Sequence, residues 1–342
     1  MKGVTLFRII LITSIFTFYL FAVDSNMVHT NIIDTTHNYI SKKVEAISNF
    51  ADSITDNTLE YTKNFTDDNG TNFKNVDALF QNERYIEEIK KSFVRLSMDY
   101  MYNSLDSNDI NIKLTAKLAL NKSRNNLRFY LSGLNQDNID DINKKNNDNN
   151  DKAEIGISYL LESTSNLQTE YFLGIRSLYP YVKGRFSYTK EMNSWTIEPV
   201  QIIEYFTRDE FKEQTKLYLD THIAKKVNLK LELSRGTNSK NSGMDYSGVA
   251  SIFWTPLNKT GVQLSQGIYG NTKYDYIVNE VTGETKVYDK INNYETTLTF
   301  RQNIYKKWLF YEISPGINFH KDNDFKANYK FLLRIDAFFG DI

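Results

Sequence analysis

From about residue 92 onward, apolar and polar side chains alternate along the chain with a period of two. In the clearest run, Ile110, Ile112 and Leu114 alternate with Asn111 and Lys113. Successive side chains of a β-strand point to opposite faces, so strict alternation predicts a strand with one apolar and one polar face. We count fourteen such runs, each of about ten residues or more, which is enough to cross a bilayer at a strand tilt of about 45°.

The connections between these runs alternate in length. Short connections separated by long, polar ones are typical of outer-membrane barrels, in which the long loops are extracellular. The sequence therefore predicts an antiparallel transmembrane β-barrel of about fourteen strands over residues 92–342, with twelve strands as the alternative count. The short set is Asn121–Asn125, Ser163–Leu167, Lys190–Ser194, Ala224–Lys226, Pro256–Lys259 and Asn303–Lys307, and the long set includes Asn135–Lys152, Gly236–Gly243 and Asn271–Asp289.

The polar face of each run carries charges, which in a barrel would line a wet lumen. A soluble sandwich or propeller, the competing fold, would expose them to solvent instead. Aromatic residues near the strand ends favour the barrel, as in Tyr100, Tyr179, Tyr181, Trp254 and Trp308. Mixed signs in one confined space indicate either cross-barrel ion pairs or a selectivity ring. The expected lumen-lining residues are Arg176, Arg185, Glu198, Glu204, Glu232, Glu295, Arg301, Glu312, Arg334 and Asp336.

One lumen trio stands out because it adjoins a rare Pro-Gly pair. Glu312 lies close to Pro315 and Gly316, where we expect a bend, and Arg301 and Arg334 fall on the two adjoining strands. Fourteen strands lie between the eight that side chains fill and the sixteen to eighteen that leave a channel. A narrow pore is therefore compatible with this strand number.

The residues before the barrel have two different textures. Residues 1–23 combine Lys2 and Arg8 with an apolar run of secretory length and end near Ala22, so we interpret them as a cleaved signal peptide; the alternative is a single membrane anchor. Residues 24–91 predict a helical periplasmic segment or plug, with a second helix over residues 75–91. A seven-residue spacing places four isoleucines on one helix face, namely Ile33, Ile40, Ile47 and Ile54.

Composition excludes several classes of function. The chain has 342 residues, no Cys, a net charge of −1 and a mean hydropathy of −0.49. Low hydropathy argues against a helical membrane protein but not against a barrel, whose apolar and polar faces cancel in the mean. The charge balance predicts no nucleic-acid partner. The absence of Cys removes disulfides, thiolate metal sites and cysteine nucleophiles.

The C-terminal segment carries the pattern WLFYEI.PG at Trp308–Gly316, D.DF at Asp322–Phe325 and LRI…FG at Leu333–Gly340. This ending resembles that of a family of uncharacterised bacterial outer-membrane proteins. Gly174-Ile175-Arg176 and Arg185 are also similar to the middle part of that family. The resemblance implies an outer-membrane barrel and supplies no catalytic residue. The last strand also resembles a barrel-assembly signal, except that Gly340-Asp341-Ile342 follows the final aromatic residue.

No spacing in the chain selects a catalytic or metal-binding set. None of His29, His37, His222 and His320 has a nucleophile, zinc or dyad context, so we expect no enzyme, cofactor or metal. The acidic loop Asn135–Lys152 lacks the pattern of a calcium-binding loop, so we interpret it as a solvated loop. The alternatives, a catalytic set on the barrel rim and a calcium site in this loop, stay open.

Two functions remain. The first is a narrow outer-membrane channel for small solutes in a Gram-negative envelope, gated or filled by the N-terminal segment. The second is a non-conducting structural or interaction barrel that displays extracellular loops and a periplasmic helical arm. Expected partners are outer-membrane lipid and the barrel-assembly machinery. The isoleucine face could lie against this same chain, self-associate or bind a periplasmic partner.

Overall fold

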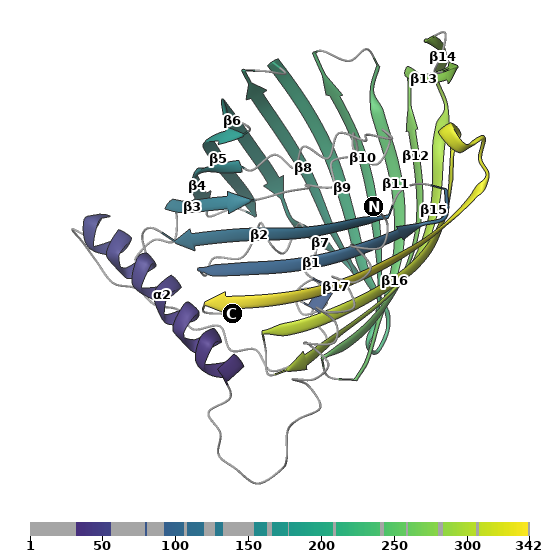
Figure 1. Cartoon of the computed structure of the whole chain (residues 1–342). Helices are drawn as coiled ribbons and strands as arrows, with labels where there is room; N and C mark the ends of the chain where they lie inside the picture. The colour runs from purple at the N-terminus through teal and green to yellow at the C-terminus, as the bar shows by residue number, and fades with distance from the viewer. Residues whose placement is uncertain are drawn as a thin grey trace. The chain divides into compact units, whose positions relative to one another are not determined.

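The computed structural model describes most of the barrel and part of the segment before it (Figure 1). The described residues are 32–55, 79–80, 92–105, 108–119, 127–132, 154–162, 166–176, 178–207, 210–239, 243–257, 259–279, 283–305 and 308–340. The signal-peptide region 1–23 and most of the second helix expected over residues 75–91 lie outside them. The sequence therefore remains the basis for both predictions.

Fourteen strands form the barrel, and each matches one of the alternating runs. Long strands of β-branched and aromatic residues suit a sheet whose two faces meet different surroundings. The barrel strands are β1 (Phe93–Asn103), β2 (Asp109–Ala119), β3 (Leu127–Ser132), β4 (Glu154–Glu162), β5 (Leu167–Arg176), β6 (Tyr179–Tyr188), β8 (Trp195–Phe206), β9 (Glu210–Ala224), β10 (Val227–Asn238), β11 (Asp245–Leu257), β12 (Thr260–Asn271), β15 (Ile291–Tyr305), β16 (Leu309–His320) and β17 (Ala327–Gly340).

Every barrel strand pairs antiparallel with its neighbours, and two pairings close the ring. The last strand, β17, pairs with β1 from Phe93 opposite Gly340 to Asn103 opposite Lys330, and β6 pairs with β8. The short strand β7 (Lys190–Met192) continues β6 towards the turn end and pairs with the start of β8 in the same register. The predicted antiparallel barrel of about fourteen strands is confirmed. The twelve-strand alternative is wrong because all fourteen runs pair within the ring, and the first of them, β1, closes it against β17.

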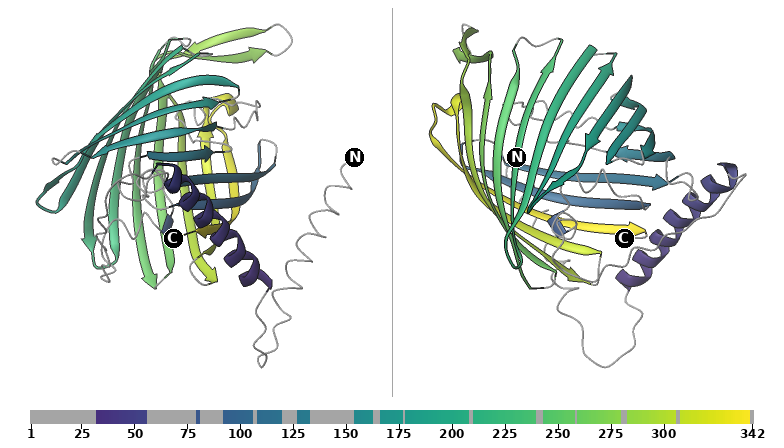
Figure 2. Two further views of the ribbon diagram at one scale, coloured as in Figure 1. Left: turned by 90° about the vertical axis from the view of Figure 1, so that its left-hand side faces the viewer. Right: turned by 180° about the vertical axis from the view of Figure 1, so that it is seen from behind.

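The two ends of the barrel differ. We call the end where β1 begins and β17 ends the turn end, because the short connections between strands lie there, and the opposite end the loop end. At the loop end, β13 (Tyr274–Asn279) and β14 (Glu284–Tyr288) pair as a separate hairpin that projects from the barrel (Figures 1 and 2). The long connection Asn271–Asp289 therefore contains a hairpin of its own. Not every connection at the loop end is long, since β5 and β6 are only two residues apart.

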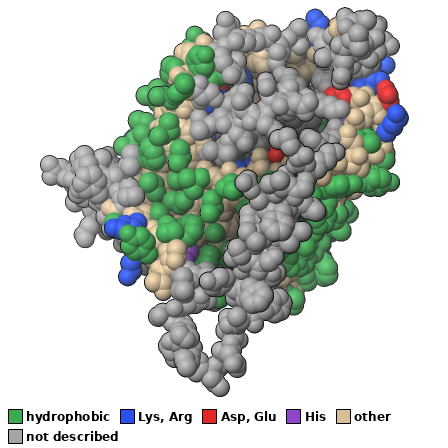
Figure 3. All heavy atoms as spheres, viewed as in Figure 1, with side chains coloured by type: hydrophobic (Ala, Val, Ile, Leu, Met, Phe, Trp, Pro, Cys, Tyr) green, Lys and Arg blue, Asp and Glu red, His purple; other side chains and the backbone are tan. Residues whose placement is uncertain are grey.

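The faces of the sheet are inverted relative to a soluble protein. Large apolar side chains on the outward positions are exposed, such as Ile112 at 61%, Leu173 at 56% and Tyr171 at 50%. Among the described residues, buried polar and charged side chains outnumber buried hydrophobic ones. Broad hydrophobic areas cover the sides of the molecule in the space-filling view (Figure 3). The apolar face of each strand therefore points outward and the polar face inward.

Two details differ from the expectations. Strand β16 continues through Pro315 and Gly316 without a register shift there, so the expected bend does not interrupt it. Because proline has no N–H for the ladder, the pairing of β16 with β15 skips Ser314 and Pro315, while the pairing with β17 continues through both. Of the strand-end aromatic residues, Tyr181 and Trp308 are only 2% and 7% exposed. These two side chains are buried and do not belong to an outward aromatic belt.

The N-terminal segment contains the helix α2 (Ile32–Thr55), as the seven-residue spacing predicts. The chain divides into two compact units, Met1–Tyr39 and Ile40–Ile342, and the division falls inside this helix. In the second unit, Val44 and Ser41 are buried, Ile40 is half-buried, and the Gly340 N–H donates a hydrogen bond to Ser41 Oγ over 3.0 Å. The side chains of Ile33, Ile47 and Ile54 lie outside the described residues.

Candidate functional site: the inner wall of the barrel

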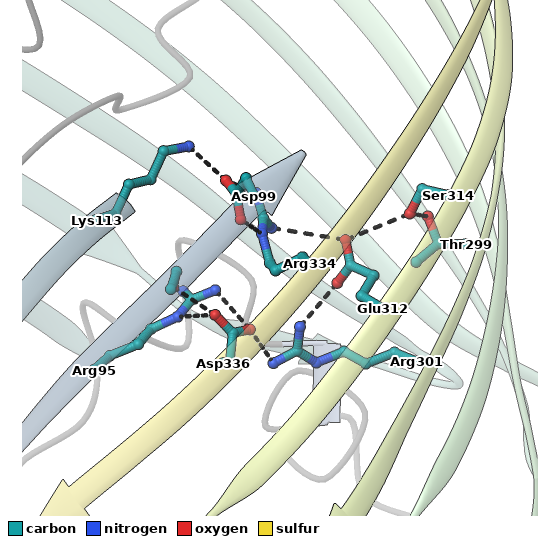
Figure 4. A network of polar contacts seen from close by, with 10 residues as sticks. Arg95, Asp99, Lys113, Thr299, Arg301, Glu312, Ser314, Arg334 and Asp336 are labelled. Carbon is teal, nitrogen blue, oxygen red and sulfur yellow. Dashed lines mark hydrogen bonds and ion pairs between the residues drawn. The ribbon is translucent and has the colours of Figure 1, made fainter. Parts of the chain in front are cut away.

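The inward positions near the junction of β1 and β17 hold a continuous network of ion pairs, which we call the seam network (Figure 4). Its centre is Asp336, which is fully buried. Arg95 donates two hydrogen bonds of 3.0 Å to this carboxylate, one from Nε and one from Nη2, and Arg301 Nη2 donates a third over 2.6 Å. Ser97 donates another from its hydroxyl group. One carboxylate thus links β1, β17 and β15.

A second carboxylate and a third extend the seam network along the wall. Arg301 Nη1 donates to Glu312 over 2.8 Å, and Glu312 lies 3.6 Å from Arg334 Nη1. Arg334 also donates two hydrogen bonds, of 2.7 and 3.0 Å, to Asp99, and Lys113 Nζ lies 2.9 Å from the same carboxylate (Figure 4). Buried charges are stable only when they are paired and hydrogen-bonded. The network satisfies this requirement across five adjacent strands, from β15 to β2.

A separate charged cluster lies towards the loop end of β4, β5, β6 and β8. Arg176 donates to both oxygens of Glu204, over 2.7 and 3.0 Å, and to Glu154 over 3.3 Å. Its guanidinium lies 4.6 Å from the ring centre of Tyr181, whose hydroxyl donates to Glu154. Phe206 contacts the same guanidinium at 5.5 Å. Bidentate pairing and stacking on aromatic rings both suit the planar guanidinium group of arginine.

Further pairs cover the rest of the charged wall. Arg128 lies 3.5 Å from Glu170, which also accepts a 2.7 Å hydrogen bond from Ser158, and Arg185 lies 3.6 Å from Glu198. By contrast, β10, β11 and β12 carry hydroxyl and amide groups on much of their inward face. The hydroxyl pairs there are Ser234 with Ser247 and Ser251 with Ser265, and Gln263 donates to Ser265 over 2.7 Å.

Charges of both signs occupy the inward strand positions in nearly equal number. The cross-strand register of the fourteen barrel strands assigns these positions to thirteen basic and fourteen acidic residues. The basic residues are Arg95, Lys113, Lys117, Arg128, Arg176, Lys183, Arg185, Lys212, Lys216, Lys230, Arg301, Lys330 and Arg334, and the acidic residues are Asp99, Asp109, Glu154, Glu162, Glu170, Glu198, Glu204, Glu210, Asp220, Glu232, Asp245, Glu295, Glu312 and Asp336. The inward positions of the described strands therefore carry little net formal charge.

At the turn end, the inward positions of the same strands become aromatic. Phe93, Phe310 and Phe338 form a buried cluster with Trp308, and Leu79 from the segment before the barrel packs against it. Such side chains would face water in an open lumen, so their coverage requires an apolar partner.

The residue after Leu79, Phe80, covers inward positions on the other side of the turn end. Phe80 packs edge-on against the inward Phe253, with ring centres 5.0 Å apart. A Cβ at Gly261 would lie 2.7 Å from both Leu79 Cδ2 and Phe80 Cζ, so only glycine leaves this space open. We call Phe253, Gly261 and the Phe93–Phe310–Phe338 cluster the apolar socket. It is occupied by Leu79 and Phe80.

All ten sequence-predicted lumen residues lie on inward positions. The structure brings Arg301, Glu312, Arg334 and Asp336 together in the seam network, and it pairs Arg176 with Glu204 and Arg185 with Glu198. Glu295 accepts a 2.9 Å hydrogen bond from Lys330 instead of joining the network, and Glu232 is half-buried on β10.

Sequence reasoning missed several members of these clusters. Arg95 and Asp99 on β1, Glu154 on β4 and Glu170 on β5 alternate with the apolar outward residues of their strands, and this alternation could have identified them. Alternation alone could not identify Phe93, Phe310 and Phe338, because aromatic residues interrupt the polar inward pattern only at one end. The occupant of the socket comes from far away in the sequence.

Within the described residues, no group of three or more His, Asp or Glu side chains is arranged to hold a metal ion. None of the helices that the structure describes is long and apolar enough to cross a membrane.

Comparison with known proteins gives no family. No protein-family model matches the sequence, and no curated protein matches it either. Similar solved structures include a loop-deletion mutant of OmpT, an outer-membrane protein of Vibrio cholerae (8% identity, 72% of this chain and 98% of that chain, TM-score 0.44). Others are an anion-selective porin from Comamonas acidovorans (9% identity, 72% of this chain and 98% of that chain, TM-score 0.43) and OccK11 of Pseudomonas aeruginosa (10% identity, 73% of this chain and 95% of that chain, TM-score 0.42).

Proposed function

We propose that this protein is an outer-membrane β-barrel that forms a narrow channel for small solutes. The observation that carries the proposal is the inversion of its two faces. The outward apolar side chains suit lipid, and the inward charges and hydroxyl groups suit water. The loop end would then face the outside of a Gram-negative cell, and the turn end the periplasm.

The nearly equal numbers of acidic and basic residues on the inner wall indicate which solutes would pass. A lumen with a net charge concentrates ions of the opposite sign, whereas a neutral lumen favours neither sign. We therefore expect weak selectivity between cations and anions. Hydroxyl and amide groups on β10, β11 and β12 would offer hydrogen bonds to small neutral polar solutes.

In this proposal Leu79 and Phe80 would keep the channel narrow at its periplasmic end. They occupy the apolar socket at the turn end, beside strands on both sides of the β12–β15 pairing. The same contact favours the alternative function, a non-conducting structural barrel. The two functions differ in whether removal of this contact produces conductance.

Planar bilayer recordings of the purified full-length protein test the proposal. We expect discrete conductance steps with a reversal potential near zero in a salt gradient, and larger or more frequent steps for Phe80→Ala. Glu232→Lys should shift the reversal potential towards anion preference while the barrel stays folded. Silence of both the wild-type protein and Phe80→Ala, after correct insertion has been verified, would contradict the channel and support the structural role.

The proposed location in the outer membrane also implies binding partners. Outer-membrane lipid would cover the apolar belt, and the barrel-assembly machinery would insert the chain. We propose that a periplasmic partner or a second copy can engage the isoleucine face of α2. Charged substitutions at Ile40 and Ile47 should then dissociate a complex recovered by cross-linking, and complexes that survive both substitutions would contradict this role.

A further inference from the structure

A hydrogen-bonded polar patch interrupts the outward apolar belt on β8, β9 and β10. Thr215 Oγ1 donates to Gln201 Oε1 over 2.7 Å, and Gln201 Nε2 donates to Glu213 over 3.2 Å. Arg235 reaches Thr215 from Nε over 3.3 Å and Glu213 from Nη2 over 3.4 Å. We call these four residues the outer polar patch.

The register places the patch on the outside of the barrel. Gln201 pairs with Thr215, and Thr215 pairs with Arg235, so their side chains share one face. The alternate positions point inward, because Val200 and Lys216 are 2% and 6% exposed. The Arg235 side chain is 57% exposed.

Apolar side chains border the patch both towards the loop end and towards the turn end. Ile203, Tyr205 and Phe211 lie on its loop-end side with 40%, 52% and 42% exposure, and Leu233 lies on its turn-end side with 51%. On β8 and β9 the patch therefore lies inside the apolar belt, whereas on β10 Arg235 is followed towards the loop end by the exposed Thr237. A charged, hydrogen-bonding cluster in contact with lipid is costly, and such groups in membrane proteins usually have protein partners.

We propose that the outer polar patch is the contact between two copies of this chain in the membrane. The inference rests on the proposed membrane location. The patch is complementary to itself, because it offers one guanidinium and one carboxylate side by side. A two-fold axis along the membrane normal would place Arg235 of each copy against Glu213 of the other, as an isologous interface requires. On the neighbouring β11, Tyr246 lies opposite Arg235, and the outward Gly248 and Ala250 follow towards the turn end, where they keep the surface low enough for close approach.

Cysteine cross-linking tests the contact directly, because the chain contains no Cys. In Thr215→Cys the single thiol would lie near the axis, and mild oxidation in membranes should join two copies through a disulfide. The matched control is Ile112→Cys on β2, also outward and 61% exposed, which should stay monomeric. Equal cross-linking of the two variants would overturn the proposal.

Native mass spectrometry of the protein in detergent gives an independent readout. Arg235→Gln and Glu213→Gln should each lower the dimer fraction at least five-fold. The double exchange Arg235→Glu with Glu213→Arg should restore it, since the charges remain complementary. Folding is checked by heat-dependent gel migration, and insertion by flotation with liposomes.

The outcomes separate this proposal from the proposed function. A barrel that fails to insert contradicts the membrane location. An inserted barrel that stays monomeric contradicts only the two-copy contact. A monomer that carries bound lipopolysaccharide would assign the patch to lipid and would also overturn the proposal.

Discussion

The seam network and the apolar socket share the strands β1, β16 and β17, on which their residues are only two positions apart. In each shared strand the aromatic residue lies two positions from the charged one and nearer the turn end. The pairs are Asp336 and Phe338, Arg95 and Phe93, and Glu312 and Phe310. The two regions even touch, since Arg301 lies 5.1 Å from the ring centre of Phe310. Yet one region is made of charges and the other of hydrocarbon.

The difference shows that inward side chains can be buried in two ways, by partners within the barrel or by residues from outside it. The seam network is completed within the barrel, because each guanidinium finds a carboxylate on an adjacent or next-nearest strand. The socket cannot be completed in this way, since neighbouring aromatic rings leave their open side uncovered. It requires Leu79 and Phe80 from outside the barrel. Breaking each region separately should therefore have different consequences.

The largest effect is expected from Asp336→Ala. The substitution leaves Arg95 and the fully buried Arg301 without their shared carboxylate, and loss of one partner of a buried ion pair costs about 3–5 kcal/mol. The urea midpoint of the barrel in detergent, followed by tryptophan fluorescence, should fall accordingly. Asp289→Ala, which removes an exposed carboxylate between β14 and β15, is the control. Equal midpoints for the two variants would mean that the network does not stabilise the seam.

The next effect is expected from Gly261→Leu, because the new side chain would occupy the space of Leu79 and Phe80. Overpacking of this kind typically costs about 1–3 kcal/mol. If the occupant leaves, Trp308 becomes exposed, and acrylamide should quench its fluorescence more strongly in a background where Trp195 and Trp254 are Phe. Gly248→Leu is the matched control, since a Cβ there meets only Leu233 at 3.5 Å. Unchanged quenching would contradict the socket.

A smaller effect is expected from Arg334→Lys, which keeps the charge but loses the two-pronged grip on Asp99. The ammonium group of Lys can replace only one of those bonds, so we expect a loss of about 1 kcal/mol in the free energy of unfolding. Arg334→Met should cost more, because Asp99 would then depend on Lys113 alone. A midpoint for Arg334→Lys equal to that of Arg334→Met would show that geometry contributes nothing beyond charge.

The smallest effect is expected from Lys330→Met. Its pair with Glu295 is partly exposed, with side chains 24% and 21% accessible. Exposed pairs contribute about 0–1 kcal/mol and are screened by salt. The difference from the wild-type protein should vanish in about 1 M salt, at which the Debye length is about 3 Å. A difference that persists there would place this pair with the seam network.

Much of the barrel could be predicted from alternation, because the side-chain period of a strand depends only on the backbone. This is why the strands around Ile112, Leu231 and Leu298 and the inward parity of Arg301 and Asp336 could be predicted. The partner of each charge could not be predicted, because it depends on register and on side-chain reach across strands. Asp336 contacts Arg95, which lies more than two hundred residues earlier.

The sequence by itself determined that the strands alternate between one apolar and one polar face and that the isoleucines from Ile33 to Ile54 lie on a helix, and it predicted about fourteen strands. These follow from local periodicity, which every short segment expresses by itself. Only the tertiary structure decided that the charges pair across the seam, that Gly261 makes room for Phe80, and that a polar patch on the outer wall surrounds Thr215. The seam depends on closure of the ring, the space at Gly261 on a residue pair from before the barrel, and the patch on the register of adjacent strands, and no local pattern in the sequence relates the residues involved.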